Sequence, residues 1–169
     1  TLVPHSPAHG FGFMVRLRDG RVLLGGGGGT PTAVEAFDAD TNTFTTVGPL
    51  QQPRTAGVAV ALPDGSAPVI GGDPAGDVIE QFDPKANTFA TTSYQLAVGR
   101  SEEAAVLVRD GTVLVVGGIL PNAGCTTTTS VEQVDPGAQT VTKFPDRPSS
   151  STELSGIALA DGSVLVAGG

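Results

Sequence analysis

The sequence predicts an all-β fold made of a repeated unit of four short antiparallel strands. Two signatures that recur along the 169 residues support this prediction. The first is an Asp-Gly pair, a short apolar run and a Gly-Gly pair, found as "RDGRVLLGG" (18–26), "PDGSAPVIGG" (63–72), "RDGTVLVVGG" (109–118) and "ADGSVLVAGG" (160–169). The second is found as "AVEAFDADTNTF" (33–44), "VIEQFDPKANTF" (78–89) and "SVEQVDPGAQTV" (130–141). The Asp-Gly pairs recur at steps of 45, 46 and 51 residues, and the Gly-Gly pairs, counted from residue 25, at steps of 46, 46 and 51.

The second unit shows the four strands most clearly. The stretches 55–62 and 66–72 are apolar and are joined by the tight-turn signal Asp64-Gly65. Residues 78–83 alternate apolar and polar side chains, and 87–92 form the fourth strand after an Asp-Pro turn. No stretch has a convincing helical period, so all four segments are predicted to be strands.

Four antiparallel strands repeated every 45 to 51 residues are typical of the blades of a β-propeller. We predict blades at 9–47, 54–93 and 100–144 and a half blade at 152–169. Strand 163–168 would then have one unpaired edge, and the flanks of the first and last blades would expose apolar surface. A closed ring needs more strands than these, so we expect a piece of a larger propeller, or copies that associate to cover the open flanks.

The second signature and the glycine pair together resemble the Kelch repeat. Phe37 and Phe82 stand where that family commonly has Tyr, and Phe44 and Phe89 where it commonly has Trp; the third unit departs, with the valines Val134 and Val141. The family often has an arginine at the head of the first strand, which Arg54 and Arg100 match, while His9 and Ser151 replace it in the other two units. The motif "DGxVLVxGG" is similar to the repeats in the propellers of galactose-oxidase-like proteins. The resemblance implies a propeller, and we expect the four phenylalanines to be buried between blades.

The five glycines at 25–29 invite comparison with a phosphate-binding loop. Such a loop needs a following helix, whose N-terminal amides face the phosphate, and a Lys-Ser/Thr pair. Here Thr30-Pro31-Thr32 and another strand follow instead. We therefore interpret the glycine pair as the end of the second strand, and we expect Gly27, Gly28 and Gly29 only to lengthen one connection.

Composition limits the possible partners. The net charge is −8 and only two lysines occur, which argues against nucleic-acid binding. No run of residues is long and apolar enough for a membrane span. Cys125 is the single cysteine, so an internal disulfide is excluded and a cysteine-based zinc site is not expected. A low lysine content with many Thr, Ser, Ala and Gly residues favours a secreted or cell-surface protein.

Two segments contain potential metal ligands. His5 and His9 have the four-residue spacing of a helical chelate, but the neighbouring prolines and glycine oppose a helix. Residues 38–42 have the oxygen spacing of a calcium loop but lack its later glycine and glutamate, so a turn is favoured. The copper site that a likeness to galactose oxidase would imply needs two tyrosines, and Tyr94 is the only one here. We expect no metal and no cofactor.

Two interpretations of the arginines remain open. Arg54 and Arg100 are predicted near Glu80 and Glu132, either as ion pairs that lock a blade, which we favour, or as ligand-binding groups at the rim. The connection 119–130 is long where its counterpart 73–77 is short, and loops that differ in length often carry function. We predict His9, Arg54, Arg100, Asn122 and Thr126 as the ligand-binding residues.

We expect a non-catalytic recognition scaffold that binds a protein or glycan on this rim. The alternative is a carbohydrate-active enzyme, oxidase- or mutarotase-like, whose catalytic residues lie partly outside the chain. Function resides in sites rather than in folds, so the repeat itself does not decide between them.

Overall fold

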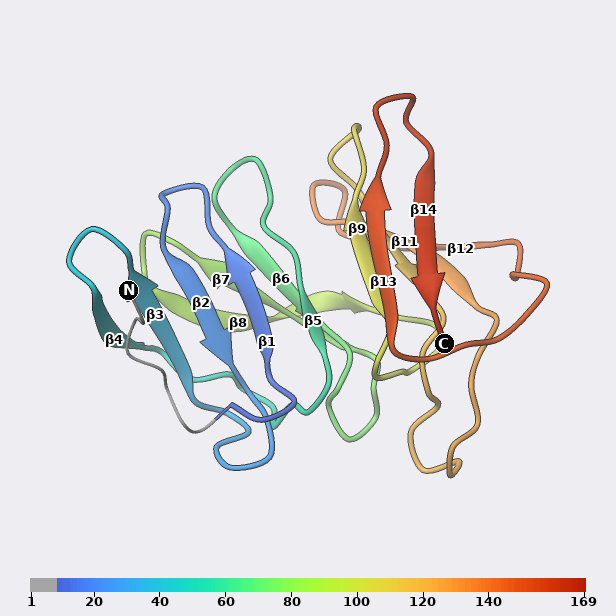
Figure 1. Cartoon of the computed structure of the whole chain (residues 1–169), viewed down its shortest axis with the longest axis horizontal. Helices are drawn as coiled ribbons and strands as arrows, with labels where there is room; N and C mark the ends of the chain where they lie inside the picture. The colour runs from blue at the N-terminus through green and yellow to red at the C-terminus, as the bar shows by residue number, and fades with distance from the viewer. Residues whose placement is uncertain (1–8) are drawn as a thin grey trace.

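The computed structural model describes residues 9–169 as three four-stranded antiparallel sheets followed by a two-stranded hairpin (Figure 1). The first sheet contains β1 (Phe13–Arg16), β2 (Val22–Gly25), β3 (Val34–Asp38) and β4 (Thr43–Val47). The second contains β5 (Val58–Ala59), β6 (Ala67–Ile70), β7 (Val78–Asp83) and β8 (Thr88–Gln95). The third contains β9 (Ala104–Leu107), β10 (Val113–Val116), β11 (Val131–Asp135) and β12 (Thr140–Phe144), and the hairpin contains β13 (Leu154–Ala158) and β14 (Val164–Gly168). The described residues contain no helix, so the prediction of an all-β fold is confirmed.

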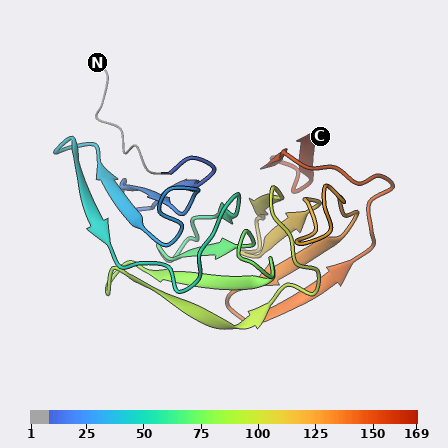
Figure 2. The same ribbon diagram turned by 90° about the horizontal axis from the view of Figure 1, so that it is seen from below.

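The sheets follow one another around an arc (Figure 2). Their first strands β1, β5 and β9 lie on the inner side of the arc, β13 packs beside β9, and β4, β8 and β12 lie on the outer side. The two ends of the arc do not meet. The strands in a sheet pair in chain order, so each sheet is a simple meander.

This arrangement gives the molecule two rims. We call the upper rim of Figure 1 the turn rim, because it carries the Asp-Gly turns and the turns between third and fourth strands. We call the lower rim the loop rim, because it carries the connections between second and third strands and the entries into the first strands. Residues 119–130 lie on the loop rim.

One strand is much shorter than the sequence predicts. The stretch 55–62 forms regular ladder pairs only at Val58 and Ala59, although Val60 and Leu62 still donate to Pro68 and Ser66. Pro68 lies in the partner strand and has no N–H to donate back to Val60, so the ladder loses a bond there and regular pairing ends at Ala59. The other three predicted strands of this unit are confirmed as β6, β7 and β8.

The glycine pair begins one residue later in the first unit than the sequence pattern suggests. Gly26 and Gly27 have positive φ angles, 69° and 92°, like Gly71 and Gly72 in the second unit. The backbone N–H of Gly27 donates to the carbonyl of Arg54 at 2.8 Å. A Cβ on Gly27 would lie 2.5 Å from the Gly10 carbonyl oxygen. The expectation that Gly27 only lengthens a connection is therefore wrong.

The same bond joins every neighbouring pair of units. Gly72 donates to the carbonyl of Arg100 and Gly118 to that of Ser151, each at 2.9 Å. The acceptor is always the residue at the head of the next unit's first strand. Each glycine pair thus ends a strand and also ties its sheet to the next, which explains why left-handed backbone is needed there.

Two apolar clusters fill the spaces between the three sheets. Phe82 and Phe89 are buried against the first sheet, as predicted, and their rings lie 5.1 Å apart. The second cluster lies between the second and third sheets and includes Val134, with Val141 packed against it. These valines stand at the positions of the phenylalanines, so the second junction contains less side-chain volume.

Phe37 and Phe44 are only half-buried, which corrects the expectation of full burial. Their rings still pair across the strands, at 5.0 Å. The physical reason is their position, because Phe82 and Phe89 face the preceding sheet, and among residues 9–169 no sheet precedes the first.

The hairpin leaves apolar side chains uncovered. Ile157 is 60% exposed and Leu165 is 54% exposed. Within the described residues β14 pairs only with β13, whereas β2, β6 and β10 each pair on both sides.

No helix among the described residues is long and apolar enough to cross a membrane.

We expect Phe82→Ala to lower the free energy of unfolding by about 3–5 kcal/mol, because the ring is fully buried. Phe37→Ala, at the equivalent position of the first unit, is the matched control and should cost clearly less, since that ring is only half-buried. Urea denaturation of both variants measures the difference. Equal losses would show that the two aromatic pairs are not placed as described.

We also expect copies of this chain to self-associate in dilute solution. An unpaired strand edge beside exposed Ile157 and Leu165 favours pairing with another chain. Light scattering over a concentration series tests this expectation. A stable monomer across the whole series would contradict it.

Candidate functional site

A buried arginine closes the loop-rim end of the second sheet. Arg54 is 1% exposed, and its Nη2 atom donates to Glu80 Oε1 at 3.0 Å. Its Nη1 atom donates to the carbonyl oxygens of Gly71 at 2.6 Å and Val78 at 2.9 Å. Glu80 also accepts from the backbone N–H groups of residues 51 and 52, so the carboxylate joins the entry loop to the third strand.

Arg100 repeats this arrangement in the third sheet. It is 0% exposed and forms an ion pair with Glu132, and it donates to the carbonyls of Gly117 and Ser130. Glu132 accepts from two N–H groups of the entry loop, at residues 97 and 98. Burial lowers the pKa of Arg100, and the nearby carboxylates, Glu132 first, oppose this shift.

The first unit contains a weaker form of the pair. His9 lies at the arginine position, its Nδ1 atom is 2.7 Å from the Gly26 carbonyl oxygen, and its Nε2 atom is 3.4 Å from Glu35. His5 lies outside the described residues. In the fourth unit Ser151 takes the arginine position, and Arg147 reaches its hydroxyl at 2.8 Å.

These contacts decide between the two interpretations of the arginines. The prediction of Arg–carboxylate pairs that lock each unit is confirmed for Arg54 and Arg100. Neither guanidinium group has a free face for a ligand, so this reading replaces their tentative ligand-binding role. The His9 side chain is also largely buried.

The other two predicted ligand-binding residues are exposed on the loop rim. Asn122 makes one long contact to the Pro74 carbonyl, 3.4 Å, and Thr126 donates to the Ala123 carbonyl at 2.6 Å. Cys125 is exposed between them. A ligand role for Asn122 and Thr126 stays a prediction.

The former calcium-loop candidate is a turn. Asp38 Oδ1 accepts the backbone N–H groups of Asp40 and Thr41, at 2.8 and 3.1 Å, so this carboxylate caps the turn. Among residues 9–169 no three His, Cys, Asp or Glu side chains are grouped to hold a metal ion.

The loop rim also carries a repeated strained position that the sequence does not reveal. We call it the rim ladder: Phe11, Ala56, Glu102 and Glu153, each two residues after the arginine position and each with a φ angle between 50° and 62°. The N–H of Ala56 donates to the Phe11 carbonyl at 2.7 Å, and that of Glu102 to the Ala56 carbonyl at 2.8 Å. Left-handed backbone is costly for a bulky residue such as Phe11, so the surroundings must hold it there.

Glu103, beside the ladder, is the most unusual ionisable group in the described structure. It is 5% exposed, and neither carboxylate oxygen has a hydrogen-bond partner. The equivalent residues in the first two units are Gly12 and Gly57, so the sequence pattern places no carboxylate there. Burial raises the pKa of Glu103 to about 8, although Arg100 and Arg54 act in the opposite direction. At neutral pH the carboxyl group is therefore mostly protonated.

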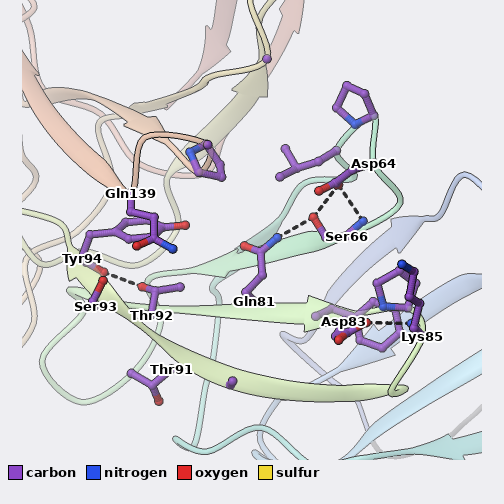
Figure 3. Close-up of a pocket in the computed structure, with 18 residues that line it drawn as sticks. Asp64, Ser66, Gln81, Asp83, Lys85, Thr91, Thr92, Ser93, Tyr94 and Gln139 are labelled. Carbon is purple, nitrogen blue, oxygen red and sulfur yellow. Dashed lines mark hydrogen bonds between the residues drawn. The ribbon is translucent and has the colours of Figure 1, made fainter.

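A cleft of about 790 Å³ opens between the second and third sheets at the turn rim (Figure 3). Its polar walls include Ser66, Gln81, Tyr94 and Gln139. It lies on the opposite side of the molecule from the predicted ligand-binding rim. Sequence reasoning missed it, because its walls come from two units that the repeat pattern treats separately.

The pKa of Glu103 predicts a pH-dependent stability. Between the unfolded pKa near 4.5 and the folded value of about 8, the folded chain holds a proton that the unfolded chain has lost. The contribution of Glu103 to the free energy of unfolding should therefore be fully present below pH 4.5 and be lost as the pH rises towards 8.

Glu103→Gln should remove this dependence and stabilise the protein at pH 7, by on the order of 3 kcal/mol. Denaturation midpoints between pH 4 and 9 measure it, with Glu102→Gln as the neighbouring control that should keep the slope. A Glu103→Gln variant with an unchanged slope would contradict this assignment.

Comparison with known proteins shows a likeness of fold. No protein-family model matches the sequence, and no curated protein matches it. Among solved structures, the chain is similar to YjhT, with a TM-score of 0.78 and 16% identical residues. The match covers 92% of this chain and 57% of the YjhT chain. The chain thus shares its fold with a little over half of that structure.

Proposed function

We propose that this chain is a Kelch-type β-propeller segment that serves as a recognition scaffold, binding a protein or glycan on the loop rim. The two recurring signatures, the meander sheets around an arc and the likeness to YjhT support the propeller assignment. The blade assignment and the Kelch family remain part of this proposal.

The observation that carries the proposed function is Phe11. Its side chain is 80% exposed, and its backbone is left-handed at a φ angle of 62°. The bond from Ala56 accounts for the left-handed backbone, but folding gives no reason for a bulky apolar side chain at this position to project into water. Strained and exposed positions of this kind occur at binding surfaces.

The rest of the rim ladder makes this surface selective. Its backbone is fixed by bonds between units, yet its side chains differ: an aromatic ring, a methyl group and two carboxylates. A fixed frame with different side chains is how repeat scaffolds acquire specificity. A ladder with Phe11 in the first unit and with Glu102 and Glu153 in the third and fourth favours a protein partner that offers an apolar group at one end and basic groups towards the other.

A second function, a carbohydrate-active enzyme, is favoured by one observation. Glu103 holds a proton near neutral pH, as a general acid must. It ranks second because this carboxyl group is almost closed off from solvent. Turnover of a sugar substrate that Glu103→Gln abolishes would reverse the ranking.

Displayed-peptide and glycan libraries, screened with the unmodified chain, test the scaffold proposal. Ligands recovered should bind at least about tenfold more weakly to Phe11→Ser and to a chain lacking residues 121–128. Deleting this loop should leave the sheets folded, because long connections tolerate change. Asp40→Ala on the turn rim is the control and should bind normally. Ligands that ignore both loop-rim changes but are lost from turn-rim variants would refute the proposal.

A further inference from the structure

The cleft at the turn rim contains a hydrogen-bond acceptor whose orientation is fixed. The Asp64 carboxylate accepts the Ser66 hydroxyl at 2.6 Å, which leaves the Ser66 oxygen free to accept. The Ser66 oxygen accepts a hydrogen bond from the amide nitrogen of Gln81, also at 2.6 Å. The order of these bonds forces the Gln81 oxygen to the other side, and Figure 3 shows it turned away from Ser66 and towards Tyr94.

That oxygen has no partner in the protein. Gln81 Oε1 has almost no accessible surface and accepts no hydrogen bond, so a ligand that enters the cleft beside Gln81 must displace the side chains over this atom to reach it. A shielded acceptor without a donor is costly, so the site calls for a hydroxyl or N–H group from a bound molecule. The Gln81 amide cannot flip without breaking its bond to Ser66. Its free oxygen can therefore bind only ligand groups that donate a hydrogen bond.

The neighbouring strand of the same sheet offers an aromatic surface. Tyr94, the only tyrosine, lines the cleft at the end of β8 and packs its other side against the apolar cluster between the sheets. Burial, and then the nearby Asp135 carboxylate, raise the pKa of Tyr94, so its hydroxyl stays protonated and can donate. One ring surrounded by amides and hydroxyls suits the C–H face and the hydroxyl groups of a sugar.

Charge narrows the class of ligand further. Asp64 and Asp83 line the cleft, Lys85 is its only cationic side chain, and Asp135 lies close to Tyr94. This excess of carboxylates disfavours phosphates and acidic sugars. A volume of about 790 Å³ is ample for one or two sugar units.

We propose that this cleft binds a neutral saccharide of one or two units, with Gln81 Oε1 accepting a sugar hydroxyl and Tyr94 supporting the ring. The site is on the rim opposite to the proposed scaffold surface, so either proposal can fail without the other.

The third sheet provides a matched control. Asp110, Thr112 and Gln133 repeat the same relay, with Gln133 donating to Thr112 at 2.7 Å. Gln133 does not line the cleft. Gln81→Leu and Gln133→Leu therefore remove equivalent structural bonds, but only the first removes the acceptor from the cleft.

Titrating the ¹⁵N-labelled chain with lactose, maltose and cellobiose tests the proposal by NMR. We expect at least one of these sugars to bind with a Kd of about 1 mM and to shift backbone signals of residues 81 and 90–94. Gln81→Leu and Tyr94→Ala should each weaken this binding roughly tenfold, while Gln133→Leu should leave it unchanged. Glucuronic acid serves as the anionic-sugar probe and uridine as the nucleoside probe, and neither should bind.

Three results would overturn the proposal. One is the absence of shifts with every neutral sugar at roughly ten times that concentration, which would leave water as the partner of Gln81. Another is equal weakening by Gln81→Leu and Gln133→Leu, which would make the relay merely structural. The third is preferential binding of uridine or glucuronic acid, which would place a different ligand class in the cleft.

Discussion

The buried pairing of an arginine with a glutamate holds the second and third units together at their loop-rim ends. Arg54 with Glu80, and Arg100 with Glu132, connect the entry of the first strand to the middle of the third strand and to the end of the second. Removing one partner of such a pair leaves an uncompensated buried charge, which typically costs about 3–5 kcal/mol. The carbonyl of the same arginine then accepts the N–H of the preceding unit's glycine, so one residue fixes a sheet internally and also sets its neighbour.

This anchoring has a consequence for function. Because the backbone of the loop rim is fixed by arginines, glycines and the bonds of the rim ladder, the side chains that project from it are not needed to maintain the fold. Phe11 and Glu102 can differ completely in chemistry at equivalent positions without disturbing the sheets. The weaker His9–Glu35 pair of the first unit and the Arg147–Ser151 contact of the fourth show that the anchor itself varies towards the ends of the arc.

The sequence predicts the parts of this structure that depend on repetition. Strands, turns and arginine–glutamate pairs follow from patterns that occur several times, so chance agreement is small. The sequence patterns do not predict features that depend on a single residue. Pro68 shortens β5 because one missing N–H interrupts a ladder. Gly27 rather than Gly25 belongs to the glycine pair, and five identical residues in a row cannot show which two have left-handed backbone.

Residues of the candidate sites were harder to predict for the same reason. Glu103 stands where the first two units have glycine, so no pattern marks it, and its meaning comes only from burial against the second unit. The relay of Asp64, Ser66 and Gln81 is visible in retrospect, because Asp110, Thr112 and Gln133 repeat it. That Gln81 has an unpartnered oxygen depends on the neighbouring sheet, which a single unit does not encode.

The departures from the repeat gather at the junction between the second and third sheets. There Val134 and Val141 replace an aromatic pair that elsewhere contributes about 0.5–1.5 kcal/mol beyond its burial. The same junction contains the desolvated Glu103 on one rim and the cleft with its unsatisfied Gln81 oxygen on the other. Each of these departures is expected to lower the stability of the second junction. The first junction shows the more stable arrangement, because Phe82 and Phe89 fill the corresponding space there. Local rules that are broken together at one place, without a structural gain, are characteristic of functional sites. The second junction is therefore where the departures from the repeat and the cleft coincide.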